Sequence, residues 1–310
     1  MVTGQPTPAL RSPALLPLLV AMTDIATFAR VKRPVVSTWR RRYPDFPAAV
    51  SENSGRPLFD GTQVTEWLIA SGLGNAAPLE LRSELALFGI IALRDRFTPW
   101  QLVETLGSLL CLRRLDRRPL SDDANVSPAS APGTEADEAL WSALLRRAER
   151  IDAEDDFVLR ELRAIDATAA PLARLAEDLV ESAYDEHGAY EWLLAARSRL
   201  GLDSLAADAV APELRSLLTQ LTDLRLRLEQ GESLTLADPH ARAGDLLAAL
   251  LDDTEDRDRV TVLAADPDDR LTRITRRRLL LAGIGELELD VQTGIDLEEH
   301  FADPDLVVTQ

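Results

Sequence analysis

The sequence contains little cysteine or histidine, and this scarcity excludes several kinds of site. A single cysteine, Cys111, cannot form a disulfide framework or a cysteine-based metal centre within one chain. Because Cys111 lies in a leucine-rich segment, we expect a buried structural thiol and not a nucleophile. The three histidines, His187, His240 and His300, lack the spacing of metal ligands. We therefore predict no metal site and assign no catalytic residue.

Long apolar runs are also missing. The stretch from Pro13 to Met22 is too short for a transmembrane helix, which needs about 20 residues. A cleaved signal peptide is the alternative interpretation of this stretch. However, the stretch continues into a polar segment with the pattern of folded structure, and no convincing cleavage site follows it. We expect a cytoplasmic protein without a membrane partner.

Basic residues are in the minority, since 34 Lys and Arg face 52 Asp and Glu, for a formal net charge of −18. A uniformly acidic protein is repelled by nucleic acid. The charge is uneven, however, because residues 1–60 hold eight Lys and Arg against four Asp and Glu, and the other 250 residues hold 26 against 48. This distribution indicates that only the N-terminal segment contacts a polyanion.

The basic N-terminal segment has the pattern of two helices joined by a short turn. Thr23 is a suitable N-cap for a helix over residues 23–30, which would be apolar on the face of Ile25 and Phe28. Residues 31–33 are short enough for a helix-turn-helix connection. Pro34 then suits the first position of a second helix, which runs to Arg42.

The second helix has the composition of a recognition helix. Val35, Val36 and Trp39 are expected to face the first helix, which leaves the polar residues on other faces to reach bases and phosphates. A β-hairpin is predicted between Phe46 and Phe59, followed by a third helix capped by Asp60 or Thr62. The residues predicted to contact DNA are Arg33, Ser37, Thr38, Arg40, Arg41, Arg42 and, near the hairpin tip, Arg56.

This segment resembles the winged-helix heads of the MerR and excisionase type, and those attached to some bacterial adenine DNA methyltransferases. The resemblance implies double-stranded DNA as partner, whereas a basic helix in a protein-binding domain is the alternative. Those families often have a small residue or glycine where this chain has Lys32. The matching residues are Asp24-Ile25-Ala26, Val31, Val36-Ser37, Trp39 to Arg42, Phe46-Pro47, Leu58-Phe59, Val64 and Trp67-Leu68.

From about residue 231 the pattern changes to short apolar runs that alternate with helical stretches. Helices are expected over 244–251 and 268–282. Strands that alternate with helices predict a parallel, doubly wound sheet. The last strand lies at the end of the sequence, so we expect only part of such a domain. The predicted strands are Ser233–Ala237, Arg259–Ala265, Glu286–Val291 and Asp305–Thr309.

The same region resembles the modification subunits of type I restriction systems, beginning with the segment Gly188 to Leu193. That family has an Asp-Pro-x-Cys-Gly-x-Gly-Gly turn, whose glycines let the backbone approach S-adenosylmethionine. Asp238, Pro239 and Gly244 match this turn. The departures are Ala241, Arg242 and Asp245, together with Ala211, which stands where a threonine is usual.

Further matches follow in the same order. Asp266 ends the second strand, where the family's acidic residue accepts hydrogen bonds from the ribose hydroxyls. Gly294 to Leu297 resembles the segment that approaches the adenine ring. The helix with Arg276, Arg277 and Arg278 also resembles the family's, and we expect these arginines to face solvent. The cofactor-binding residues that the resemblance implies are Asp238, Gly244, Asp266 and Asp296.

These observations predict an N-6 adenine DNA methyltransferase-like protein whose binding of S-adenosylmethionine is weak or absent. The sequence ends at Gln310, where the family's Asn-Pro-Pro-aromatic motif begins, so no methyl transfer is expected. The alternatives are a non-enzymatic DNA-binding regulator or defence-system component, and a protein-interaction module. Besides DNA, the partners considered are another protein and a second copy of the chain.

The fold class that follows is α combined with α/β. We predict a flexible N-terminus and a winged helix-turn-helix domain, then helical parts on both sides of a linker, and a partial Rossmann-like methyltransferase domain. The segments in this order are 1–17, 18–75, 76–118, 119–136 (linker), 137–230 and 231–310.

Overall fold

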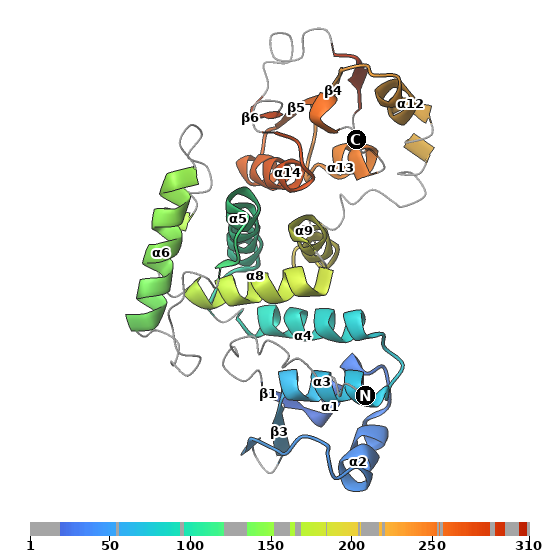
Figure 1. The fold of residues 1–310 in the computed structure, drawn as a ribbon, viewed down its shortest axis with the longest axis vertical. Coiled ribbons are helices and arrows are strands. Elements are labelled where there is room, and N and C mark those ends of the chain that lie inside the picture. Colours follow the sequence, from blue (N-terminus) through green and yellow to red (C-terminus); the bar gives the residue numbers. More distant parts are fainter. Residues whose placement is uncertain are drawn as a thin grey trace, which may run out of the picture.

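The computed structural model describes most of the chain (Figure 1). Predictions for residues 1–17, most of the 119–136 linker, Ala211, Asp296 and Gln310 lie outside the described residues. The described residues are 19–53, 56–93, 96–120, 135–151, 162–164, 169–183, 185–203, 205, 217–218, 221–252, 254, 257–285, 289–294 and 304–308.

The N-terminal unit, residues 19–71, has three helices and a three-stranded antiparallel sheet in the order β1-β3-β2. Its core is rich in aromatic side chains, and Phe46 lies edge-on to both Phe59 and Trp67. The elements are β1 (Leu19–Ala21), α1 (Met22–Phe28), α2 (Arg33–Arg42), β2 (Ser51–Asn53), β3 (Arg56–Asp60) and α3 (Gly61–Ser71).

Local hydrogen bonds set the ends of these helices. The prediction of Thr23 as N-cap is wrong, because α1 begins one residue earlier and Asp24 accepts a bond from the Ala21 N–H at 2.7 Å. Asp60, one of two predicted caps of α3, accepts a bond from the Thr62 N–H at 2.9 Å. Helix α2 ends at Arg42, since Tyr43 precedes a proline and takes up an extended conformation.

The middle of the molecule is helical. Helix α4 contacts α1 and α3 of the N-terminal unit on one side and α8 on the other (Figure 1). One hydrophobic cluster includes residues from both sides of the predicted linker, and Cys111 is fully buried in it, as expected. The helices are α4 (Pro78–Ala92), α5 (Pro99–Asp116), α6 (Glu135–Ile151), α8 (Ala170–Ala183) and α9 (Glu186–Ala195).

The C-terminal unit contains a four-stranded sheet in the order β6-β5-β4-β7, with every adjacent pair parallel. The predicted parallel sheet is therefore present, and its strands lie within a few residues of the expected positions. Helix α14 packs on α5 and α9 of the middle helices (Figure 1). The elements are α12 (Leu224–Glu229), β4 (Leu234–Asp238), α13 (Asp245–Asp252), η3 (Arg257–Arg259), β5 (Val260–Asp266), α14 (Asp269–Leu281), β6 (Leu289–Thr293) and β7 (Leu306–Val307).

Two absences apply to the described ranges alone. None of their helices has the length and apolar character needed to span a bilayer. They also contain no group of three His, Cys, Asp or Glu side chains placed to hold a metal ion.

Candidate functional site

Helix α2 is held in the N-terminal unit by two buried side chains. Val36 is fully buried, and Trp39 packs on Trp67 with a ring separation of 6.1 Å. The Trp67 Nε1–H donates to the Asp45 carboxylate at 3.0 Å, which satisfies the polar end of this ring. Val35 was expected to face α1 as well, but it is 38% exposed. The buried positions of a helix recur every three or four residues, here at Val36 and Trp39, so Val35 is turned outward.

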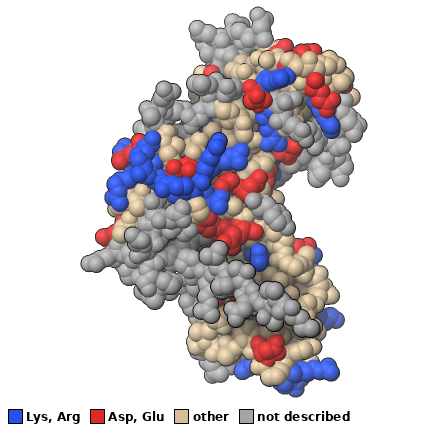
Figure 2. Space-filling view, in the orientation of Figure 1, with Lys and Arg blue, Asp and Glu red and all other residues tan. Residues whose placement is uncertain are grey.

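The exposed face of α2 is cationic. Arg33, Arg41 and Arg42 are exposed, and none of them forms an ion pair with a carboxylate among the described residues. Thr38 is also exposed, and its hydroxyl donates to the Pro34 carbonyl at 3.0 Å. Figure 2 shows Lys and Arg side chains gathered at the lower end of the molecule, where α2 lies in Figure 1.

Three other predicted DNA-contact residues have different surroundings. Ser37 is half-buried, and its hydroxyl lies 3.7 Å from the Met22 sulfur, so it points toward α1. The Arg40 guanidinium lies over the Phe59 ring, 5.7 Å from the centroid, which ties this exposed side chain to the sheet. Arg56 is exposed at the start of β3. The face of α2 available to a ligand is therefore smaller than the sequence indicated.

The turn between α1 and α2 is fastened by a segment that the sequence analysis missed. The Asn75 amide donates to the Arg30 carbonyl at 3.0 Å, and the Asn75 N–H donates to Ala29 at 2.8 Å. Gly74 has a φ of 101°, and a Cβ there would lie 3.0 Å from the Ala29 carbonyl oxygen. The left-handed position in this turn is Arg30, whereas the backbone of Lys32 is extended. The turn therefore needs no glycine or small residue at Lys32.

At the other end of the chain, two predicted cofactor residues end neighbouring strands. Asp238 ends β4 and Asp266 ends β5, and both are almost fully buried. The Asp238 carboxylate accepts a hydrogen bond from the His240 N–H at 3.0 Å. Burial, followed by the smaller effect of the negative Asp266, raises the pKa of Asp238 to about 6, although the His240 N–H acts in the opposite direction.

Two backbone N–H groups of the chain donate to the carboxylate that was expected to bind the ribose. One oxygen of Asp266 accepts a bond from the Arg242 N–H at 3.1 Å, and the other accepts one from the Asp268 N–H at 2.9 Å. Arg242 stands where the family has its first glycine, and its φ of 53° is in the left-handed region that favours glycine. The turn thus keeps a glycine-like conformation with an arginine in it, and the Arg242 side chain is exposed.

Gly244 and Asp245 serve the packing of this turn. A Cβ on Gly244, whose φ is 72°, would lie 3.1 Å from the side chain of Thr275 on α14. Asp245 is buried and forms ion pairs with Arg278 and, at 3.0 Å, with Arg197. Burial acts to raise the pKa of Asp245, but the two guanidiniums, Arg278 foremost, outweigh it and lower that pKa.

The expectation that arginines 276–278 face solvent is wrong. Arg277 and Arg278 are at most 1% exposed, and Arg276 is half-buried. Arg278 pairs with Glu191 of α9 as well as Asp245, so the ion pairs join the helical middle to the C-terminal unit. Sequence reasoning missed Glu191 as a partner, although it lies within the segment that carries the family resemblance.

The predicted site residues therefore fall into two separate regions, one on α2 and the start of β3 and one at the carboxyl edge of the C-terminal sheet. Of the predicted cofactor residues, Asp238, Gly244 and Asp266 lie together, and Asp296 lies outside the described residues. The adjacent Gly294 N–H donates to the Asp266 carbonyl at 3.1 Å, which holds the end of β6 beside β5.

Comparison with known proteins gives a distant likeness to a solved structure. No protein-family model and no curated protein matches the chain. Among solved structures, the chain is similar to the methyltransferase subunit of a type I restriction-modification system from Streptococcus thermophilus, with 14% sequence identity and a TM-score of 0.45. The match covers 74% of this chain and 63% of that subunit, so this chain spans less than two thirds of its length. The likeness assigns no activity to this chain.

Proposed function

We propose that the protein binds double-stranded DNA through its N-terminal unit, with α2 as the recognition helix and the β2–β3 hairpin as the wing. Two helices joined by a short turn and followed by a β-hairpin support this proposal, because a helix-turn-helix places its second helix in the major groove. The observation that carries the proposal is the division of α2 into two faces. Val36 and Trp39 seat the helix in the core, and the opposite face is exposed. The side chains on that exposed face are Arg33, Val35, Thr38, Arg41 and Arg42.

The exposed residues divide by chemistry. Arg41 and Arg42 lie in the last turn of α2 without a described carboxylate partner, which leaves their charge available to phosphates. Val35 offers an apolar contact for the methyl group of thymine, and Thr38 offers a hydroxyl to base edges. Ser37 is assigned no base contact because it points to Met22.

For the C-terminal unit, we infer a scaffold like that of an N-6 adenine DNA methyltransferase that binds S-adenosylmethionine weakly or not at all. The strand order β6-β5-β4-β7 supports the scaffold, because it is the order of the first strands of a Rossmann-type sheet. The bonds from Arg242 and Asp268 to Asp266 support weak binding, because each takes an acceptor position on the carboxylate that would hold the ribose and fewer remain for a diol.

A non-enzymatic DNA-binding regulator or defence-system component is the second candidate function. Asp245 favours it, because this residue replaces a cofactor-side glycine and serves an ion pair between helices instead. Isothermal titration with S-adenosylmethionine separates the candidates. Micromolar binding to the intact chain supports the methyltransferase and contradicts our inference, whereas the absence of heat supports the regulator.

DNA binding itself is tested with the full chain and a fluorescein-labelled duplex by anisotropy at two salt concentrations. We expect binding whose logarithm falls linearly with the logarithm of salt concentration, with a slope of about −0.9 per phosphate contacted. Absence of binding at the lower salt concentration contradicts the proposal. Binding that does not respond to salt also contradicts it, because the exposed face of α2 is cationic.

A further inference from the structure

A second cationic region lies far along the chain from α2, at the C-terminal end of α5. A cavity of about 620 Å³ opens there, between the end of α5 and the segment that follows α14. The cavity lies apart from the carboxyl edge of the sheet. Its residues 283–285 lie between α14 and the start of β6, and parallel strands begin at the edge opposite to their carboxyl ends. The residues that line it are Arg113, Arg114, Leu115, Arg117, Arg118, Pro119, Glu186, Leu280, Gly283, Ile284 and Gly285.

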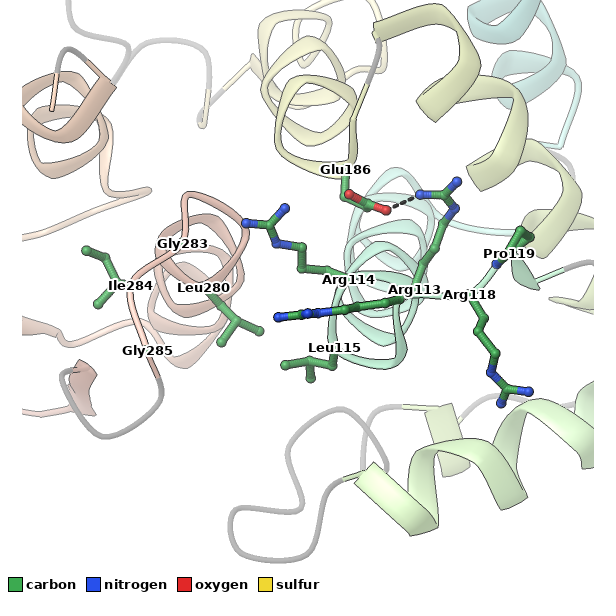
Figure 3. Close-up of a pocket in the computed structure, with 11 residues that line it drawn as sticks. Arg113, Arg114, Leu115, Arg118, Pro119, Glu186, Leu280, Gly283, Ile284 and Gly285 are labelled. Atoms are coloured by element: carbon green, nitrogen blue, oxygen red, sulfur yellow. Dashed lines mark hydrogen bonds and ion pairs between the residues drawn. The ribbon is translucent and has the colours of Figure 1, made fainter. Parts of the chain in front are cut away.

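Four arginines and one carboxylate line this cavity, in a chain that is acidic overall. Arg113 is turned toward Glu186, with which it pairs, and it also pairs with Glu177 at 3.0 Å (Figure 3). Arg118 points away on the other side and pairs with Asp116 at 2.7 Å (Figure 3). Two of the four arginines therefore have their charge balanced by the protein.

The other two arginines, Arg114 and Arg117, are exposed and form no ion pair with a carboxylate among the described residues. A Cβ on Gly283 would lie 3.7 Å from Arg114 Nη2, so this guanidinium reaches across to the glycine on the far wall. Figure 2 shows Lys and Arg gathered in a band where α5 and α6 lie in Figure 1. The cavity thus presents two positive charges that a dianion would balance.

The backbone of Arg117 adds an independent observation. Arg117 ends α5 with a φ of 55°, a left-handed position that is usually glycine at the end of a helix. This conformation is unfavourable for an L-residue, because its Cβ comes close to the following carbonyl oxygen. An arginine at the end of a helix also interacts favourably with the helix dipole, but an arginine at a neighbouring, unstrained position would have the same effect. The dipole therefore does not explain an arginine at position 117.

The opposite wall of the cavity is apolar and partly free of side chains. Leu280 faces Leu115 across the gap, with Ile284 beside it and Gly283 and Gly285 on either side (Figure 3). Leu280 and Ile284 are themselves buried, so the accessible part of this wall is the backbone of the two glycines, which leaves room for a flat organic group while charged groups meet the arginines. The volume is in the range of small-molecule sites, which is about 300–1,000 Å³. A groove for a phosphodiester backbone needs no such apolar recess.

We propose that this cavity binds a nucleotide, with the phosphate groups held by Arg114 and Arg117 and the base against the exposed backbone of Gly283 and Gly285 and the half-buried Leu115. The guanidinium group suits this role because its planar donors match the oxygens of a phosphate group. The site is independent of the DNA contact proposed for α2, and it does not use the carboxyl edge of the sheet.

The test is isothermal titration of the full chain with ATP in metal-free buffer, with inorganic phosphate and a DNA duplex as comparison ligands. We expect ATP to bind, and Arg114→Gln/Arg117→Gln to weaken it by at least about tenfold, since two charge-assisted contacts are lost. Arg163→Gln/Arg225→Gln, which removes the same number of charges from exposed pairs elsewhere, is the matched control and should leave ATP binding unchanged. Arg117→Gly should weaken ATP binding while raising the melting temperature, which separates a ligand role from a structural one.

Four results overturn the proposal. The first is that the unmodified chain gives no heat with ATP. The second is that the cavity variant and the control variant bind ATP equally well. The third is that inorganic phosphate binds as tightly as ATP, which reduces the cavity to a simple anion site. The fourth is that a DNA duplex displaces ATP from the Arg41→Gln/Arg42→Gln variant, which would make Arg114 and Arg117 part of a DNA contact. The circular dichroism spectrum of each variant verifies its fold.

Discussion

The backbone N–H of Arg242 donates a hydrogen bond to the Asp266 carboxylate at 3.1 Å, so the turn after β4 is tied to the end of β5. The side chain of Arg242, which departs from the glycine of the family's turn, is exposed. The main chain of this turn donates to a carboxylate that the family resemblance assigned to the ribose of a cofactor. This distinction changes what a substitution at Arg242 is expected to do.

Arg242→Gly should stabilise the protein without creating a cofactor site. Glycine removes the left-handed strain but adds flexibility to the unfolded chain, for a net gain of about 0.5–1 kcal/mol. The Asp266 bond remains, because glycine keeps the N–H. Urea unfolding measures the first effect and isothermal titration with S-adenosylmethionine the second. Micromolar binding by the glycine variant would show that the arginine side chain alone blocks the site.

Asp238 should make stability depend on pH below neutrality. Its folded-state pKa of about 6 lies above the ordinary value of 3.8, so the folded chain holds the proton more tightly. The resulting stability is fully present below about pH 4 and is lost as the pH rises through about 6, by at most roughly 3 kcal/mol. Asp238→Asn, which keeps an oxygen for the His240 N–H, should flatten this dependence.

Thermal unfolding at several pH values between about 4 and 7 measures the effect of Asp238. The exposed Asp258→Asn serves as the control. Burial, then the charges of Glu181 and Glu177, raises the pKa of Asp178 to about 7, which adds a dependence of the same sign in both variants. An unchanged slope in Asp238→Asn contradicts the assignment of a raised pKa to this carboxyl.

Loss of the Arg278 guanidinium should destabilise the protein strongly. Arg278 pairs with Glu191 and Asp245, and its replacement by methionine leaves both carboxylates short of a buried partner. Breaking a buried ion pair in this way costs about 3–5 kcal/mol. Arg163→Met removes an exposed pair with Glu149 and should cost about 1 kcal/mol or less. Equal losses in urea unfolding contradict a structural role for the buried network.

The exposed side chains of α2 should determine which DNA sequence the protein prefers. Thr38→Ala and Val35→Ala should change the preferred sequence selected from a randomised duplex library, since these exposed side chains are placed to meet bases. Ser37→Ala should leave the preference unchanged, because its hydroxyl lies against Met22. A change in preference on Ser37→Ala alone means that α2 meets DNA with a different face.

Local sequence patterns predicted the strands well and the buried charges poorly. The apolar runs that end in Asp238-Pro239 and Asp266-Pro267 identify β4 and β5, because their signal lies within a few neighbouring residues. Arg278 gave no such signal. Its partner Glu191 is 87 residues away, and a run of three arginines has the pattern of a solvated helix until the fold brings the carboxylates together.

The same limit explains the errors on α2. Helical spacing is compatible with Val35 and with Val36 on the core side. The packing of Trp39 on Trp67 sets the rotation of the helix, which buries Val36 and exposes Val35. Gly74 and Asn75 fasten the α1–α2 turn from outside the segment that resembles a DNA-binding head. Contacts between distant segments cannot be obtained from periodicity alone.

The most direct test of the DNA-binding proposal is the affinity of Arg41→Gln/Arg42→Gln for duplex DNA, measured by anisotropy across a salt series. The control is Arg163→Gln/Arg225→Gln, which removes the same number of charges from exposed pairs outside the N-terminal unit. We predict that the α2 variant binds more weakly on every duplex and that its salt slope is smaller by about 2, while the control is unchanged. If both variants lose affinity equally, or if neither does, α2 is not the DNA-binding surface.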